Sequence, residues 1–105
     1  MKLIKQALPD FYQELKGALE ELNRTELTEQ LQSLAIVKHT IDKTGNAIYL
    51  YTSDGTELKK VKESVAECLD LKSIPGMVVM DLGDFNRIMG IEVLDRPDVG
   101  KGLKN

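Results

Sequence analysis

The sequence predicts an α+β protein, in which two N-terminal helices pack on a four- or five-stranded antiparallel β-meander sheet. Two observations lead to this fold class. Apolar residues recur every three or four positions up to about residue 35, as in helices, and they alternate from residue 36 onward, as in strands. The 105 residues are expected to form a single domain, with a helical part over 1–35, a β-meander over 36–95 and a tail over 96–105.

The first helix is predicted to run for about four turns and to end near residue 22. Its apolar residues share one face of the helical wheel: Leu8, Phe11, Leu15, Leu19 and Leu22. Pro9 suits the first turn, where its missing N–H is no loss, whereas Gly17 weakens the middle. Thr25 can cap a second, shorter helix, whose apolar side holds Leu27, Leu31 and Leu34.

Segments rich in β-branched and aromatic residues predict strands at 36–41, 47–53, 77–82 and 87–94. The predicted turns lie at 42–46, 53–56 and 73–76, and Asp-Gly in the second of them supplies the positive φ that a tight hairpin requires. Periodicity alone leaves the segment 56–71 open between helix and strand. Pro97 is expected to stop the last strand, and the tail after it to fray.

The acidic stretch 78–95 could be a calcium-binding loop or a β-hairpin. A calcium loop of twelve residues counted from Asp81 would end at Glu92, but positions 3, 5 and 6 are then Gly83, Phe85 and Asn86. Two side-chain ligands and the obligatory glycine are therefore missing, and the flanking residues have strand periodicity.

A hairpin with its loop at 83–86 fits better, because it sets Val78 opposite Ile91 and Met80 opposite Met89. In that register Glu92 faces Met77, roughly 13 Å along the strand from Asp81, which is too far to share an ion. The loop residues Gly83 and Asn86 tolerate left-handed backbone conformations. The hairpin is the preferred interpretation, and no metal site is predicted.

The segments "IDKTGNAIYLY", "VAECLDL" and "PGMVVMDLGDFNRIMGIEVLD" resemble the YuzE-type family of small bacterial domains of unknown function. The resemblance covers about residues 41–95 and is strongest at "RIMGIEVLD". It implies a small antiparallel meander in which 65–71 is a strand, and it implies no activity. The chain departs from the family pattern at Gly83, at Asn86 and in a longer link after 53–56, and the helical N-terminal third lies outside the resemblance.

The amino-acid composition argues against several classes of function. The net charge is −3, which argues against broad binding to a nucleic-acid backbone, because that requires a basic surface. A single cysteine permits no intrachain disulfide and suits a reducing compartment. No apolar run approaches the roughly 20 residues of a membrane span, and the first ten residues are not a secretory signal. We expect a cytoplasmic protein that binds neither nucleic acid nor membrane.

No residue pattern predicts catalysis, and no cofactor is expected. His39 is the only histidine, and Cys68 could act as a nucleophile with it, but a structural histidine and a small buried cysteine are the preferred interpretations. Tyr49 and Tyr51 share a strand face and could contact a ligand or a protein interface. The only dense basic run, which is read as a solvated strand edge, comprises Lys59, Lys60 and Lys62.

The leading function is therefore a non-enzymatic interaction or regulatory module that acts as a homodimer. An additional, unidentified protein partner is compatible with this function. Both sheet faces are apolar, since Ile48 and Leu50 alternate with Tyr49 and Tyr51, and two helices can cover only one face. The alternative is a small-molecule-binding protein with an apolar pocket between helices and sheet. An enzyme is the least supported class.

Overall fold

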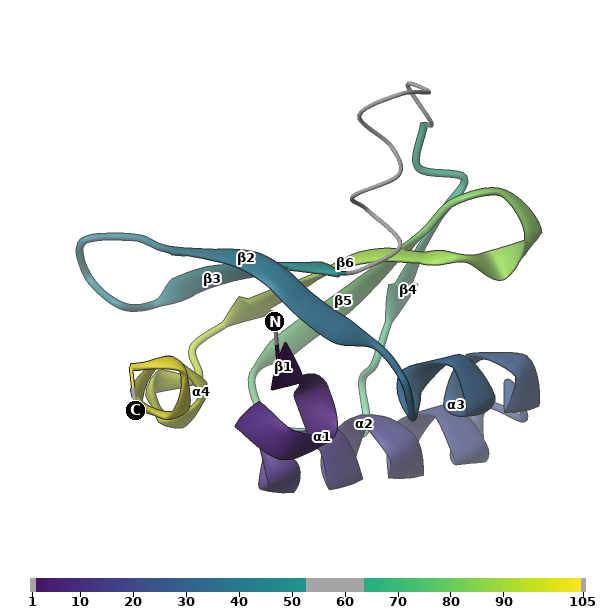
Figure 1. Cartoon of the computed structure of the whole chain (residues 1–105), viewed down its shortest axis with the longest axis horizontal. Helices are drawn as coiled ribbons and strands as arrows, with labels where there is room; N and C mark the ends of the chain where they lie inside the picture. The colour runs from purple at the N-terminus through teal and green to yellow at the C-terminus, as the bar shows by residue number, and fades with distance from the viewer. Residues whose placement is uncertain (1, 53–63, 105) are drawn as a thin grey trace.

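The computed structural model of the chain describes residues 2–52 and 64–104 (Figure 1). The turn predicted at 53–56, which includes the last residue of the strand predicted at 47–53, lies outside these residues. So does the basic run Lys59, Lys60 and Lys62. The described residues form one antiparallel sheet with helices, which confirms the predicted α+β class.

The described part of the sheet has six strands instead of the four or five expected. They are β1 (Lys2–Leu3), β2 (Ala35–Ile41), β3 (Ala47–Thr52), β4 (Glu67–Asp70), β5 (Met77–Leu82) and β6 (Ile88–Leu94). Their order is β1-β2-β3-β6-β5-β4, so the sheet is not a simple meander: β6 lies between β3 and β5. β4 resolves the ambiguity over residues 67–70 in favour of a strand, because its backbone pairs with β5.

The helices among the described residues are α1 (Ile4–Ala7), α2 (Pro9–Glu21), α3 (Thr25–Leu31) and α4 (Pro97–Leu103), and the 3-10 turn η3 (Asp84–Asn86) joins β5 to β6. Pro9 begins α2 as expected, whereas α3 starts at Thr25 with Arg24 in the cap position and no side-chain cap. None of the described helices is long and apolar enough to span a bilayer.

The predicted frayed tail is wrong, because residues 97–103 form α4. Proline is favoured in the first turn of a helix, so Pro97 both ends the strand region and begins a helix. Val99 of α4 is buried, and a Cβ atom at Gly100 would lie 3.6 Å from Ile48 Cδ1, in ordinary van der Waals contact, so α4 packs against the sheet. The C-terminal segment is therefore part of the packed domain.

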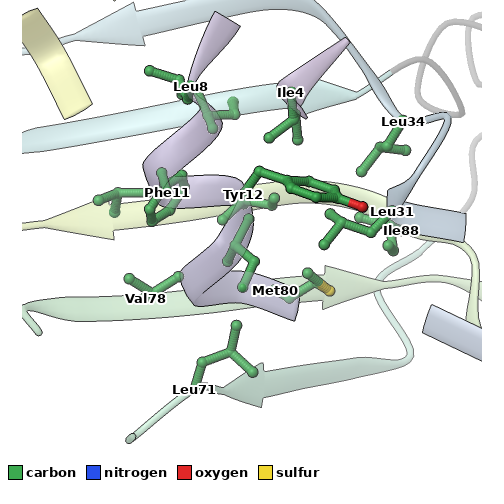
Figure 2. Packing of buried hydrophobic residues seen from close by; sticks show 14 of the residues in the cluster. Ile4, Leu8, Phe11, Tyr12, Leu31, Leu34, Leu71, Val78, Met80 and Ile88 are labelled. Carbon is green, nitrogen blue, oxygen red and sulfur yellow. The ribbon is translucent and has the colours of Figure 1, made fainter. Parts of the chain in front are cut away.

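All four helices lie on the same side of the sheet (Figure 1). Figure 2 shows Ile4, Leu8, Phe11 and Tyr12 packed over the strands that carry Val78, Met80 and Ile88. Within the apolar stripe predicted for the first helix, Leu15 and Leu19 are fully buried, but Leu22 follows the end of α2 and is 47% exposed. The one buried hydroxyl of the core strands, on Thr52, donates a 2.7 Å hydrogen bond to the Ile88 carbonyl.

Arg96 ties the helix layer to the sheet. Its guanidinium donates to both carboxylate oxygens of Glu14 on α2, at 3.0 and 2.7 Å, and to both of Asp98 on α4, at 3.0 and 2.8 Å. It also donates to the Pro75 carbonyl, at 3.0 Å, in the turn before β5. These charge-assisted bonds satisfy a side chain that is only 8% exposed, so Arg96 holds three separate segments together.

Candidate functional site

The two faces of the sheet differ in what covers them. Ile48 and Leu50 point into the helix layer and are buried, while Tyr49 and Tyr51 point to the opposite face. We call this opposite face the open face, because no described helix lies on it (Figure 1). Its side chains, taken from the strand pairing, are Lys38, Thr40, Ala47, Tyr49, Tyr51, Cys68, Asp70, Met77, Val79, Asp81, Glu92 and Leu94.

Tyr49 lies at the centre of the open face and spans three strands. Its ring crosses the backbone of Gly90 on β6, where any Cβ atom would collide with it. Its hydroxyl donates a 2.7 Å hydrogen bond to Asp81 Oδ2 on β5. Partial burial, reinforced by the Asp81 carboxylate, raises the pKa of the Tyr49 hydroxyl well above its ordinary value. Tyr49 is therefore a hydrogen-bond donor at physiological pH and is not available as a general base.

Tyr51 packs beside Tyr49, with ring centroids 4.8 Å apart and a tilt of 59° between the planes. The ammonium of Lys38 lies 5.5 Å from the centroid of the Tyr51 ring, within the range of a cation–π contact. Tyr51 is nonetheless 42% exposed. Among the described residues, the two tyrosines therefore form an aromatic pair, and Tyr51 is the member that faces solvent.

Cys68 is exposed on the open face, and the expectation that it is buried is wrong. The segment that periodicity leaves open is a strand around Cys68, as the family resemblance implies, but β4 is an edge strand of the described sheet and Cys68 faces away from the helices. Cys68 pairs with Asp81 across the strands, and this neighbouring carboxylate raises the pKa of the Cys68 thiol. A raised pKa opposes the thiolate that nucleophilic chemistry requires.

His39 does not meet Cys68. It pairs with Leu50 and so points to the face that the helices cover, where it lies exposed beyond them on β2. β2 and β4 are four strand positions apart, which corresponds to roughly 19 Å. A catalytic pair of these two side chains is therefore incompatible with the sheet.

The hairpin at 77–94 is present, but its predicted register is wrong by two residues. Val78 pairs with Val93 and Met80 with Ile91, instead of Ile91 and Met89. One residue of the difference comes from the loop, which is longer than predicted because Leu82 pairs with Ile88 and not with Arg87. The second residue comes from an irregularity between Asp81 and Leu82.

The corrected register brings Glu92, opposite Val79, diagonally next to Asp81 on the open face. Such diagonal neighbours are roughly 7–8 Å apart, closer than the predicted 13 Å. The Asp81 carboxylate accepts the Tyr49 hydrogen bond and has Cys68 as its cross-strand neighbour. Across residues 2–52 and 64–104, no cluster of three or more acidic, histidine or cysteine side chains is arranged to bind a metal ion.

The turn between β5 and β6 has an unusual backbone. Gly83 is extended, while Phe85 (φ 57°, ψ 33°) and Asn86 (φ 58°) both adopt left-handed conformations. The left-handed positions were expected at Gly83 and Asn86, so the expectation holds only for Asn86. For a residue such as Phe85 this conformation costs about 1 kcal/mol.

Two side chains from the helix layer hold this turn in place. Gln30 of α3 donates to the Asn86 carbonyl at 3.0 Å and accepts from the Ile88 amide at 2.7 Å. Arg24 donates at 3.3 Å to the Asn86 side-chain oxygen, and at the same distance to both carboxylate oxygens of Glu67. The strained backbone is therefore fixed by contacts that come from a different part of the chain.

Comparison with known proteins finds no matching family model, no similar curated protein and no similar solved structure. The resemblance of residues 41–95 to the YuzE-type family therefore stays a proposal, and the site has to be interpreted from its own geometry.

A pocket of about 160 Å³ opens among α1, α2 and α4. It is lined by Ala7, Leu8, Pro9, Asp10, Phe11, Asp98, Val99 and Gly102. Pockets that bind small molecules usually measure about 300–1,000 Å³. This pocket lies among helices and not between helices and sheet, so it does not favour the small-molecule alternative.

Sequence reasoning identified the two tyrosines but missed the partners that define their surroundings. In the sequence, Asp81 stands out only as a possible metal ligand, and no pattern marks Gly90. The missing signal was the pairing of β3 with β6, which sets Tyr51 opposite Gly90. A glycine within an apolar strand often marks a close approach of another group, and here that group is the Tyr49 ring.

Proposed function

We propose that the chain is a non-enzymatic interaction module that acts as a homodimer, with the open face as the interface between two copies. The observation that supports this most is the distribution of the helices, which all cover the other face (Figure 1). Tyr51 and Met77 are exposed on the open face, and Val79 and Leu94 are half-buried there. Exposed aromatic and apolar side chains on one face of a sheet are typical of interfaces, and tyrosine is enriched in them.

Charge supports a second copy as the partner and favours one orientation. Lys38 lies on the β2 side of the open face, whereas Asp70 and Asp81 lie on the β4–β5 side. A two-fold axis parallel to the strands would place the β2 side of one copy over the β4–β5 side of the other, so that opposite charges meet. An axis perpendicular to the strands would oppose like charges, which is unfavourable.

The mass of the particle in solution tests the proposal. Light scattering at micromolar concentration should give twice the monomer mass of 11.7 kDa. Tyr51→Asp should give a folded monomer, because the charge is introduced on an exposed face. Leu50→Asp should instead unfold the chain, because Leu50 is fully buried and a carboxylate there has no partner. A mass of one copy for the unmodified chain would disprove the dimer.

The orientation has a separate test based on charge reversal. Lys38→Glu should weaken the dimer, and Asp70→Lys in the same chain should restore it if the axis runs parallel to the strands. Lys5→Glu makes the same change on the exposed side of α1 and should leave the mass unchanged. Equal effects of Lys38→Glu and Lys5→Glu would show that the interface lies elsewhere.

A further inference from the structure

We infer that the outer edge of β2 is a docking site for an extended, acidic segment of another protein, which adds to the sheet as a further strand beside residues 38–41. The inference does not depend on the dimer, because it concerns the backbone at one edge of the sheet and not the open face. In this mode of binding, backbone hydrogen bonds supply the affinity and alternate side chains supply the specificity.

β2 is paired along only part of its outer side. β1 pairs with Ala35 and Ile36 alone, and α1 begins directly after it at Ile4. The β2–β3 hairpin extends past β1 (Figure 1), and no described residue pairs with residues 38–41 on their outer side. Residues 38–40 are exposed although their side chains alternate between the two faces of the sheet. This part of β2 is therefore an uncovered edge in the described chain.

The outer edge offers hydrogen-bonding groups at fixed positions. The Asp42 amide donates to the Ala47 carbonyl at 3.0 Å, which fixes the phase of the ladder between β2 and β3. Backbone groups alternate in direction along an antiparallel strand, so those of Thr40 point to β3, whereas those of His39 and Ile41 point outward. The outward N–H and C=O groups can pair with the backbone of an added strand.

Charge identifies the kind of strand that fits. Lys38 and Lys43 are both exposed, and neither forms an ion pair with a described residue. Lys38 contacts the Tyr51 ring but no carboxylate. Asp42 lies between the two lysines in sequence, but its carboxylate accepts hydrogen bonds from Thr44 and from two backbone amides at the same turn. Carboxylates of an added strand would therefore meet two ammonium groups that no acidic side chain of the described residues neutralises.

The same charges disfavour a second copy as the occupant. Pairing between the β2 strands of two copies would gather the lysines of both along one edge, and lysines on edge strands oppose such pairing. Lys38 lies on the open face, whereas Ile41 is partly buried against the core on the other face. An added strand with alternating acidic and apolar residues matches both sides, and a different protein has to supply it.

Amide hydrogen exchange of the full chain, followed by NMR, tests the edge directly. The probes are acetylated hexapeptides of the pattern Glu-X-Glu-X-Glu-Thr, in which X is Val, Ile or Phe, and the matched controls carry Lys in place of Glu. In the free chain the His39 and Ile41 amides should exchange about tenfold or more faster than the Thr40 amide, because only the latter is paired within the sheet. A saturating acidic probe should slow both outward amides about tenfold or more, and the basic controls should not.

Three results of this experiment would overturn the inference. Protection of the His39 and Ile41 amides in the free chain would show that another part of the chain or a second copy already covers the edge, and its dependence on protein concentration would distinguish these two. Unchanged exchange with every acidic probe would show that the edge accepts no strand. Equal slowing by acidic and basic probes would contradict the assigned charge of the partner.

Variants separate backbone pairing from side-chain contacts. His39→Pro removes an outward N–H, a change that edge strands tolerate, and should abolish binding of the acidic probes, whereas His39→Ala should bind them as the parent chain does. Lys43→Glu should weaken binding about threefold or more, and Lys5→Glu, the same charge change on α1, should leave it unaltered. Lys43 is the informative lysine because Lys38 also belongs to the open face, so peptide affinity and dimer mass report on separate proposals. Loss of binding in His39→Ala, or equal effects of the two lysine changes, would contradict the inference.

Discussion

The ring of Tyr49 lies directly across Gly90, so that a methyl group added at Gly90 would be 2.5 Å from the Tyr49 Cζ atom. The ring reaches Asp81 by this route, because only a strand residue without a side chain leaves space for it. The position of the Tyr49 ring at the centre of the open face therefore requires glycine at position 90.

Gly90→Ala should lower the free energy of unfolding by about 1–3 kcal/mol, because it forces the Tyr49 ring away from β6. Urea denaturation measures the effect. Gly17→Ala is the matched control: nothing lies within 4 Å of its Cβ position on α2, and the change should stabilise the chain by about 0.5–1 kcal/mol. If the penalty at Gly90 persists in a Tyr49→Ala background, the explanation through the ring is incorrect.

Arg96→Ala should destabilise the chain by about 2–3 kcal/mol, because it leaves Glu14 and the Pro75 carbonyl without their donor. The estimate is at the low end for a buried ion pair, since Glu14 and Asp98 stay partly exposed. Arg24→Ala removes two ion pairs of the surface type, to Glu26 and Glu67, and should cost about 1 kcal/mol or less. Equal losses for the two variants in thermal or urea unfolding would contradict the assigned role of Arg96.

Asp98 predicts a pH dependence of stability. The Arg96 guanidinium, through its hydrogen bonds, lowers the pKa of the Asp98 carboxyl below its ordinary value. A group with a lowered pKa in the folded state stabilises the fold above its ordinary pKa of about 3.9, and that stability is lost as the pH falls through the lowered pKa of the folded state. Asp98→Asn should therefore be less stable than the parent chain at pH 7. The difference in the free energy of unfolding between the two proteins, measured by urea denaturation, should shrink below about pH 4. Parallel plots of this free energy against pH from pH 7 to pH 2 would refute the prediction.

Cys68 should react slowly with thiol reagents near neutral pH although it is exposed. The Asp81 carboxylate raises the pKa of its thiol, so less thiolate is present than in the unfolded chain. Asp81→Asn should increase the rate of labelling. A native rate equal to that of the urea-unfolded chain, or a rate unaffected by Asp81→Asn, would show that Asp81 does not control the thiol.

The predictable parts of the fold are those in which local pattern and final burial agree. The stripe from Leu8 to Leu19 predicted α2, and the alternation in 77–82 gave β5 its correct bounds. The tail was misjudged because Pro97 both ends a strand and begins a helix, and the sequence favoured the first effect. β1 has only two residues, too few to show any periodicity, and exists because Lys2 and Leu3 pair with β2.

The site was less predictable because it depends on contacts between distant residues. Tyr49 and Tyr51 could be selected from their shared strand face, but their surroundings come from β6 and β5, some 30 to 40 residues later. The predicted hairpin register is wrong by two residues. A shift of two residues keeps every side chain on the same face, so apolar residues match almost equally well in both registers. The conformation of the turn at Asp84–Asn86 determines which register forms. Phe85 was noted only as a missing calcium ligand, since periodicity carries no information about a left-handed backbone.

The position of β6 between β3 and β5 also affects how the chain folds. β2 and β3 can pair as a local hairpin, and β4, β5 and β6 can pair in sequence, but the two halves of the described sheet meet only where residues 47–52 join residues 88–94. Such non-local pairing raises the contact order and slows folding relative to a simple meander. During synthesis on the ribosome the N-terminal helices and hairpin emerge first, and their apolar faces stay without a partner until β6 arrives. The growing chain should therefore pass through an aggregation-prone stage whose duration is set by the translation of the last strand.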